Sequence, residues 1–286
     1  MKFEIERVSD IGFCFGVRRA IEMLERTAAE KGEIDSLGAA VHNDRVIRKL
    51  KNSGINVIEN LEAVKSKIVA ISSHGVSPEV ESSLMTTGTN VLDTTCPFVR
   101  RAQLAARQLA EAGFQVIIFG DANHPEVKGL LGWAQGKGLA TLSSRELKDR
   151  GDLSLHAGII AQTTQIPENF LQFAGEVLKI VYRRDAEIRI VDTICPGVRK
   201  RQTISLEVAR KADLMLVIGG RNSANTRRLA ELCSEVTETH LISSAEDLDP
   251  LWLNNRKLVG ITSGTSTPDE VIEEVEKKLR EISSEN

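Results

Sequence analysis

The sequence lacks the features of several large classes of protein. Its longest apolar runs, such as residues 116–119 and 214–218, are far too short to span a lipid bilayer. The first ten residues do not have the basic start and apolar core of a secretory signal. With 37 basic and 40 acidic residues, the chain has no excess of positive charge for nucleic acid. We therefore expect a cytoplasmic protein that binds neither membranes nor nucleic acids.

Common ligand-binding motifs are also missing. There is no Walker A sequence and no Gly-x-Gly-x-x-Gly, so a nucleotide is not indicated. None of the four cysteines belongs to a Cys-x-x-Cys pair, the spacing of zinc ribbons and bacterial ferredoxins. In a reducing compartment, such lone cysteines are more often thiols, metal ligands or catalysts than disulfide partners.

The sequence does contain one motif three times, with a period near 90 residues. Cys14, Cys96 and Cys195 each stand alone, and each precedes a valine by three residues and then a pair of basic residues. In each repeat a polar residue follows the cysteine by 28 positions: His42, His124 and Ser223. Three equal offsets predict that the three cysteines share one site.

The same order of secondary structure is expected around each cysteine. A strand precedes it, a helix follows, and a second strand is predicted over residues 36–41, 115–120 and 214–220. A later strand ends in a polar cluster before a proline that begins a helix, in residues 72–78, 162–167 and 263–268. Alternating strands and helices predict α/β units with parallel sheets, whose ligands lie beyond the carboxyl ends of the strands.

The predicted fold class is therefore α/β, a ring of three pseudo-threefold-related lobes. Each lobe is expected to be a small, mainly parallel sheet with flanking helices. Lobe 1 would span residues 14–95, lobe 2 residues 96–194 and lobe 3 residues 195–286. The third repeat lacks a final strand, whereas the chain begins with an extra one. We therefore predict that the N-terminal strand, within residues 1–13, completes lobe 3.

Three lone thiolates suit a [4Fe-4S] cluster. Three cysteine ligands leave one iron open to substrate, which is typical of a Lewis-acidic catalytic site rather than of an electron carrier. A single free cysteine is more often a small core residue, but the threefold placement favours ligands here. Cys233 has no counterpart in the other repeats, and we interpret it as a core residue.

Polar side chains at the strand-to-helix turns are expected to surround this cluster. Hydroxyl, amide and imidazole groups donate hydrogen bonds to anions, with help from helix N-termini. This set favours a small phosphorylated substrate, and its members are His42, His74, His124, Thr163, Thr164, Ser223, Asn225 and Ser266.

Glu126 is the only acid expected in the site and is a candidate general acid. A helix N-terminus stabilises its carboxylate and so disfavours a bound proton, which suggests a relay through Thr163 or a substrate hydroxyl. The alternative is a first-turn glutamate that only complements the helix dipole. The basic pairs after the cysteines are either solvated helix surface or a docking face for an acidic electron donor.

The motifs together resemble those of the 4-hydroxy-3-methylbut-2-enyl diphosphate reductases, the LytB/IspH family, over nearly the whole chain. The resemblance rests on residues 12–17, 41–43, 74–77, 95–97, 124–127, 162–164, 222–225 and 264–268. It implies a trefoil around an oxygen-sensitive [4Fe-4S] cluster and the last step of the non-mevalonate (MEP) isoprenoid pathway. The substrate's allylic hydroxyl would bind the open iron, two electrons would enter from a donor such as ferredoxin or flavodoxin, and water would leave.

The products implied by this resemblance are isopentenyl and dimethylallyl diphosphate. By motif, the resemblance assigns iron to the three repeated cysteines and proton donation to Glu126. It assigns the substrate to His42, His74, His124, Thr163, Ser223, Asn225 and Ser266, with Thr164 as a further candidate.

The sequence departs from this family at two places. Ala224 stands where many members have a second serine, although its backbone amide could still donate to a diphosphate. Gly197 and Val198 replace a common Ala-Thr after the third cysteine. Three other functions stay open: a non-redox iron–sulfur dehydratase, a quinolinate-synthase-like enzyme, and an iron–sulfur sensor or carrier. A carrier would not need a ring of polar donors.

Overall fold

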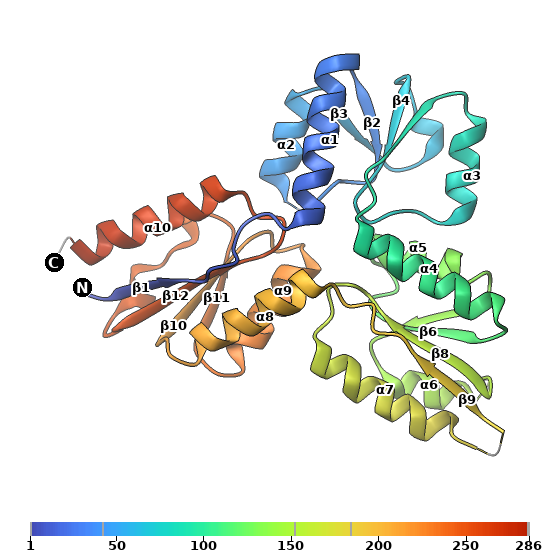
Figure 1. The fold of residues 1–286 in the computed structure, drawn as a ribbon. Coiled ribbons are helices and arrows are strands. Elements are labelled where there is room, and N and C mark those ends of the chain that lie inside the picture. Colours follow the sequence, from blue (N-terminus) through green and yellow to red (C-terminus); the bar gives the residue numbers. More distant parts are fainter. Residues whose placement is uncertain (1, 42, 152, 184, 285–286) are drawn as a thin grey trace. The chain divides into compact units, whose positions relative to one another are not determined.

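The computed structural model describes residues 2–41, 43–151, 153–183 and 185–284, so His42 lies outside the described residues. The chain forms three sheets of four parallel strands each (Figure 1). It divides into two compact units: unit 1 comprises residues 1–18, 41–49 and 196–286, and unit 2 comprises residues 19–40 and 50–195. Among the described residues, none of the helices combines the length and apolar character that a bilayer crossing requires.

The first sheet belongs to unit 2 and has the strand order β3-β2-β4-β5. Its strands are β2 (Ile34–Leu37), β3 (Ile55–Ile58), β4 (Ile68–Ile71) and β5 (Asn90–Asp93). The neighbouring helices in the chain are α1 (Phe15–Lys31), α2 (Asp44–Asn52) and α3 (Pro78–Thr86), with a 3₁₀ turn at Leu61–Ala63.

The predicted strand over residues 36–41 was wrong in its bounds. The strand β2 begins earlier, at the fully buried Ile34, and ends at Leu37. Gly38 has φ 76° and donates its N–H to the Ile58 carbonyl, so the chain leaves the sheet there. A positive φ favours glycine, and this turn therefore stops the strand before the polar residues that follow.

The second sheet, also in unit 2, has the order β7-β6-β8-β9. Helices α6 and α7 cover one face of this sheet and α4 and α5 the other (Figure 1). Its central strands are apolar on both faces, as expected for a parallel sheet buried between helices. The elements are β6 (Gln115–Phe119), β7 (Gly138–Thr141), β8 (His156–Ala161), β9 (Glu187–Ile190), α4 (Pro97–Glu111), α5 (Pro125–Trp133), α6 (Ser144–Arg150) and α7 (Pro167–Val181).

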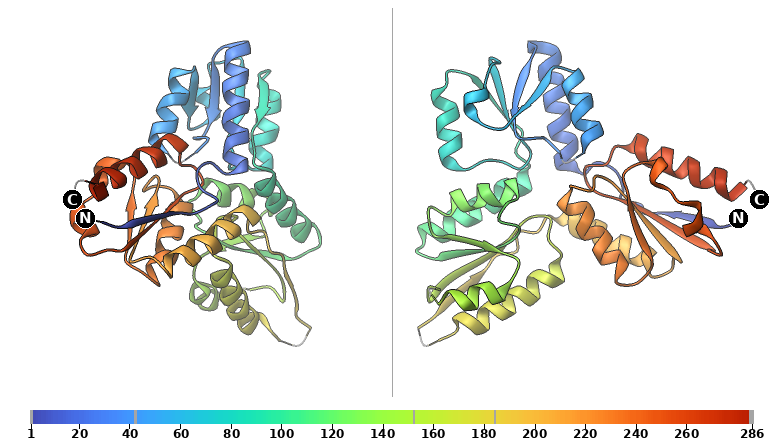
Figure 2. Two further views of the ribbon diagram at one scale, coloured as in Figure 1. Left: turned by 60° about the vertical axis from the view of Figure 1, so that its left-hand side comes forward. Right: turned by 180° about the vertical axis from the view of Figure 1, so that it is seen from behind.

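The third sheet lies in unit 1 and includes the N-terminal strand, β1 (Glu4–Arg7). Figure 2 shows this dark blue strand among the orange strands from the other end of the chain. Glu4 pairs with Leu258 and Arg7 with Ile261, so β1 joins the sheet as the repeat predicts. The remaining elements are β10 (Leu214–Ile218), β11 (Thr239–Ile242), β12 (Leu258–Ser263), α8 (Pro196–Ala209), α9 (Ala224–Ser234), α10 (Asp269–Ser284) and 3₁₀ turns at Ala245–Asp247 and Pro250–Leu253.

The three sheets have equivalent strand orders, because β1 lies beside β12 as β5 lies beside β4 and β9 beside β8. The strands β1, β5 and β9 each lead to one of the repeated cysteines, and a helix begins at the residue after that cysteine. The three parallel α/β sheets predicted from the sequence are confirmed. The exact lobe limits at residues 14, 96 and 195 stay a prediction.

Candidate functional site

The three repeated cysteines occupy equivalent backbone positions. Each is half-buried and lies just before a helix, α1, α4 or α8. Each cysteine N–H donates to a carbonyl in one of the polar clusters that precede a proline: Cys14 to Thr265 at 3.0 Å, Cys96 to Ser73 at 3.0 Å and Cys195 to Thr163 at 2.9 Å. Cys14 belongs to unit 1, and Cys96 and Cys195 belong to unit 2.

Cys233 differs from these three cysteines in its burial and in its position within a helix. Its side chain is fully buried in α9 and packs with Met215, Val217 and Leu229. Burial raises the pKa of its thiol to about 12, so the group stays protonated at neutral pH. A metal ligand must be a thiolate, and the interpretation of Cys233 as a core residue is confirmed.

Side chains that sequence reasoning missed support the cysteine loops of unit 2. Thr94 and Thr193 are fully buried, and their hydroxyls donate to the carbonyls of Ile71 and Ala161 at the ends of β4 and β8. Both threonines follow an aspartate, a repeated Asp-Thr pair that could have identified them.

The second residue of two basic pairs also contacts a cysteine loop. Arg19 donates to the Thr95 carbonyl at 3.2 Å, and Arg101 donates to the Ile194 carbonyl at 3.4 Å. In both cases the acceptor is the residue just before the next cysteine along the chain. Solvated surface is therefore an incomplete description of these two arginines.

Unit 2 contains a buried pair of predicted site residues, Glu126 and Thr163. Glu126 lies in the first turn of α5 with only 1% of its surface exposed. Its Oε1 accepts the Thr163 N–H at 2.6 Å, and its Oε2 accepts the Thr163 hydroxyl at 2.9 Å. Thr163 follows β8, so the turn after one strand fixes an acid on the neighbouring helix. The hydroxyl is placed to exchange a proton with the carboxyl group.

Two predicted histidines lie near each other in the same unit. His124 is the N-cap of α5, and its Nδ1 accepts the Glu126 N–H at 3.2 Å. In the neutral ring this bond leaves the proton on Nε2, which becomes a donor for a ligand. The ring of His74 meets that of His124 edge-on, with centroids 5.3 Å apart. Thr164, a further candidate, is half-buried beside Thr163.

Unit 1 holds the predicted residues Ser223, Asn225 and Ser266. Ser223 is the N-cap of α9 and accepts the Thr226 N–H at 3.3 Å. Asn225 and Ala224 lie in the first turn, and Ser266 follows β12. Among the described residues, the buried Asn225 Nδ2 and Ser266 Oγ have no hydrogen-bond partner. Buried donors without partners are costly, and at a helix N-terminus they suit an anionic ligand.

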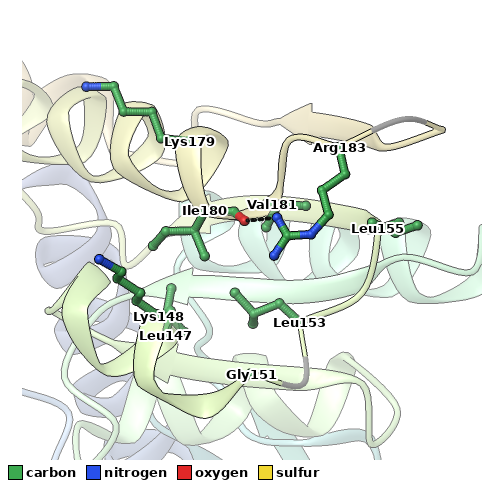
Figure 3. A pocket seen from close by; sticks show the side chains of 9 residues that line it. All are labelled: Leu147, Lys148, Gly151, Leu153, Leu155, Lys179, Ile180, Val181 and Arg183. Atoms are coloured by element: carbon green, nitrogen blue, oxygen red, sulfur yellow. Dashed lines mark hydrogen bonds between the residues drawn. The ribbon is translucent and has the colours of Figure 1, made fainter.

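Two surface pockets are lined by residues other than these buried ones. The pocket in Figure 3 lies between α6 and the end of α7, where Leu147, Leu153 and Ile180 form an apolar floor beside Arg183. None of the predicted site residues that the structure describes lines it. A second pocket, in unit 1, is lined by Asn222, the neighbour of Ser223, together with Arg45 and Arg221. These two arginines pair with the acids Glu274 and Asp247, and a third arginine, Arg48, also lines the pocket.

Comparison with known proteins decides the family. A sequence profile described as LytB protein matches residues 5–280 of this chain. The chain therefore belongs to the LytB family. Members of the LytB family are iron–sulfur enzymes, and the half-buried cysteines agree with that class.

Curated LytB relatives are similar over nearly their full length. A protein of Dehalococcoides mccartyi named 4-hydroxy-3-methylbut-2-enyl diphosphate reductase is 52% identical over 281 residues, which cover 98% of this chain and 99% of the relative. A Geobacter metallireducens protein of the same name is 41% identical and covers 98% of both chains.

Two solved LytB structures have the same fold. A structure described as (E)-4-hydroxy-3-methyl-but-2-enyl diphosphate reductase, the terminal enzyme of the non-mevalonate pathway, is 38% identical, covers 97% of this chain and 99% of its own, and has a TM-score of 0.70. The Plasmodium falciparum E-1-hydroxy-2-methyl-but-2-enyl-4-diphosphate reductase is 26% identical, covers 98% of this chain and 88% of its own, and has a TM-score of 0.89.

Proposed function

We propose that this chain reduces (E)-4-hydroxy-3-methylbut-2-enyl diphosphate to isopentenyl and dimethylallyl diphosphate, in the last step of the non-mevalonate isoprenoid pathway. The observation that carries the proposal is the similarity, over 98% of the chain, to relatives named for this reductase. In the reaction the allylic C–O bond breaks, the substrate takes up two electrons and two protons, and one water leaves. The enzyme therefore needs an electron source, a diphosphate site and a proton donor.

Cys14, Cys96 and Cys195 hold a [4Fe-4S] cluster with one open iron in this proposal. When bound, the cluster supplies the electrons and a Lewis-acidic iron for the substrate hydroxyl. The equivalent N–H bonds and half-burial of the three thiols support this ligand set. The raised pKa of the Cys233 thiol argues against a fourth ligand there.

Donors from several loops bind the diphosphate in this proposal. Asn225 Nδ2 and Ser266 Oγ support it most directly, since both are buried donors without a partner among the described residues. Ser223 and the backbone amide of Ala224 add the N-terminus of α9, where the helix dipole favours an anion. His42, His74 and His124 are proposed as further donors, and Thr164 borders the site.

Glu126 is the proposed proton donor, with Thr163 as its relay. Burial of Glu126 excludes bulk water from the carboxyl group, so its proton passes through a bonded group. The Thr163 hydroxyl, bonded to Oε2, is that group. His124 orients the acid, because its Nδ1 accepts the N–H of the same residue.

The electron donor is proposed to be an acidic protein such as ferredoxin or flavodoxin, and the setting is proposed to be the cytoplasm. Ala224 and Gly197 leave the reaction class unchanged, because neither residue supplies the cluster ligands or the proton.

The test uses Glu126→Gln in protein purified without oxygen. We expect the variant to keep the iron and sulfide content of the wild type and to bind substrate, but to lose turnover. The matched control is Glu168→Gln, because Glu168 follows Pro167 at the start of α7 as Glu126 follows Pro125, yet is exposed. Loss of the cluster in Glu126→Gln would show that the acid has another role.

Comparing turnover with and without a reductant distinguishes the reductase from the other candidate functions. Turnover by the wild type with reduced ferredoxin or dithionite, and none without, is the expected result. Turnover without any reductant would instead identify a non-redox dehydratase or a quinolinate-synthase-like enzyme. A stable cluster with no turnover under either condition would favour a sensor or carrier.

A further inference from the structure

One arginine of unit 1 is buried as deeply as a core residue. Arg201 lies in α8, six residues after Cys195, and only 3% of its side chain is exposed. The equivalent positions of the first two repeats are the buried alanines Ala20 and Ala102. A buried charge is costly unless it is paired and hydrogen-bonded, so this position has a requirement that the other repeats do not share.

The guanidinium of Arg201 binds two segments from opposite ends of the sequence. From the N-terminal segment, Nη1 donates to the Gly12 carbonyl at 2.7 Å and Nη2 donates to Asp10 at 2.7 Å. From the segment after β12, Nη1 also approaches the carbonyls of Gly264 at 3.2 Å and Ser263 at 3.4 Å. Four acceptors therefore converge on one side chain.

Direct bonds between the two segments complete this arrangement. The Gly12 N–H donates to Ser263 Oγ at 2.9 Å, and the Cys14 N–H donates to the Thr265 carbonyl at 3.0 Å. Gly12 has φ 83°, a backbone conformation that favours glycine. The two segments are therefore joined by main-chain groups as well as through Arg201.

We propose that Arg201 is a positioning residue that holds the loop of Cys14 against the loop of Ser266. Cys14 is two residues after Gly12, and Ser266 is two residues after Gly264. We call Arg201 with its four acceptors, on Asp10, Gly12, Ser263 and Gly264, the clamp. It connects the loop of a proposed cluster ligand with the loop of a proposed substrate-binding hydroxyl. The inference rests on the proposed function for those two roles, whereas the clamp itself rests on the hydrogen bonds of Arg201 alone.

The topology explains why this junction has a buried arginine six residues after one of the repeated cysteines, where the other two junctions have an alanine. At the other two junctions, the bonded residues Ser73 and Cys96 are 23 positions apart, and Thr163 and Cys195 are 32 positions apart. One helix and one strand connect each of those pairs. Cys14 and Thr265 are 251 positions apart, so no short connection restrains them. Closing so long a loop costs more conformational entropy. The guanidinium group of Arg201, which binds both segments, holds them together in place of a short connection.

The test compares Arg201→Met and Arg201→Lys with the wild type. Lysine keeps the charge but has a single nitrogen, so it lacks the second donor atom by which Nη2 binds Asp10 while Nη1 serves the carbonyls. The control is Leu279→Ala, a buried core change in α10 of the same unit that removes none of the hydrogen bonds of Arg201. For both arginine variants we expect KM for (E)-4-hydroxy-3-methylbut-2-enyl diphosphate to rise about ten-fold or more, the equivalent of about 1.4 kcal/mol.

Hydrogen exchange on the cluster-free protein provides a readout that does not depend on the reaction. Peptides covering residues 10–14 and 263–267 should exchange about ten-fold faster in Arg201→Met than in Leu279→Ala at matched loss of Tm. If the wild type fails to turn over but this exchange difference appears, the proposed function is wrong and the clamp stands. Equal exchange in the two variants would refute the clamp.

A double variant distinguishes two roles of Arg201: positioning the two loops, or only neutralising the charge of Asp10. Asp10→Asn with Arg201→Met removes the carboxylate that would otherwise be left without its cation, yet leaves the carbonyls of Gly12, Ser263 and Gly264 without their donor. We expect the double variant to keep the raised KM and the faster hydrogen exchange of Arg201→Met. Recovery of wild-type KM and exchange would show that Arg201 only neutralises Asp10, and would overturn the proposal.

Discussion

Replacing Thr163 by valine tests the proposed proton relay most directly. Valine has the shape of threonine but lacks the hydroxyl that donates to Glu126 Oε2 at 2.9 Å. The Thr163 N–H still donates to Oε1 at 2.6 Å, so the carboxyl group stays in place. The substitution therefore removes one step of proton transfer while the backbone of the turn, and the Cys195 N–H bonded to its carbonyl, are retained.

The size of the effect follows from the hydrogen bond that is lost. A hydrogen bond to a charged group contributes about 1.5–3 kcal/mol. At about 1.4 kcal/mol for each factor of ten, kcat should fall by about 10- to 150-fold if the bond matters mainly in the transition state. KM should change little, because Asn225, Ser266 and the histidines are untouched.

The assay is anaerobic turnover under saturating reductant, with iron content measured on the same sample. Thr163→Ser is the control, since serine restores the hydroxyl and should recover most of kcat. If Thr163→Val keeps full activity, then Glu126 delivers its proton by another path and the relay is wrong. A higher KM with unchanged kcat would instead assign Thr163 to substrate binding.

Two further predictions concern a thiol and a carboxylate. Cys233→Ser should keep the iron content of the wild type, whereas Cys96→Ser should lose iron. In native cluster-free protein at pH 8, iodoacetamide should modify Cys233 only on unfolding, because burial raises the pKa of its thiol to about 12. Burial also acts to raise the pKa of Asp93, but hydrogen bonds from Thr95 and the charge and hydrogen bond of Arg100 outweigh it and hold the pKa below its usual value. Asp93→Asn should thus cost less than about 1 kcal/mol of unfolding free energy at pH 7, and the difference should decrease as the pH falls below about 4 and through the folded-state pKa.

The repeat made much of the fold predictable. Equal offsets from the cysteines placed His124 and Ser223 at strand-to-helix turns, and both residues are helix N-caps. The missing final strand of the third repeat predicted the pairing of β1, since the other two repeats each end in a fourth strand that leads to a cysteine. The bounds of β2 were missed, because Gly38 breaks the strand through its backbone rather than through the apolar pattern.

Contacts between distant residues could not be predicted in the same way. In the sequence, Arg201 is one of several basic residues of α8. Its burial can be recognised only in the folded structure, where the carbonyls of Gly12 and Gly264 lie beside it. The same is true of Arg19 and Arg101, whose acceptors are main-chain carbonyls and carry no sequence signal. Local patterns report which face of a helix is apolar, whereas these bonds depend on tertiary packing.

The pairing of β1 with β12 has a consequence for synthesis of the chain. Glu4 leaves the ribosome about 250 residues before its partner Leu258, which at ~5–20 residues per second is a wait of ~10–50 s. The sheets of β2–β5 and β6–β9 are complete within continuous stretches and can fold during that time. The N-terminal strand must remain unpaired until the last strand emerges. A nascent chain stalled before residue 258 should therefore expose β1 to chaperones and proteases while its first two sheets are already protected.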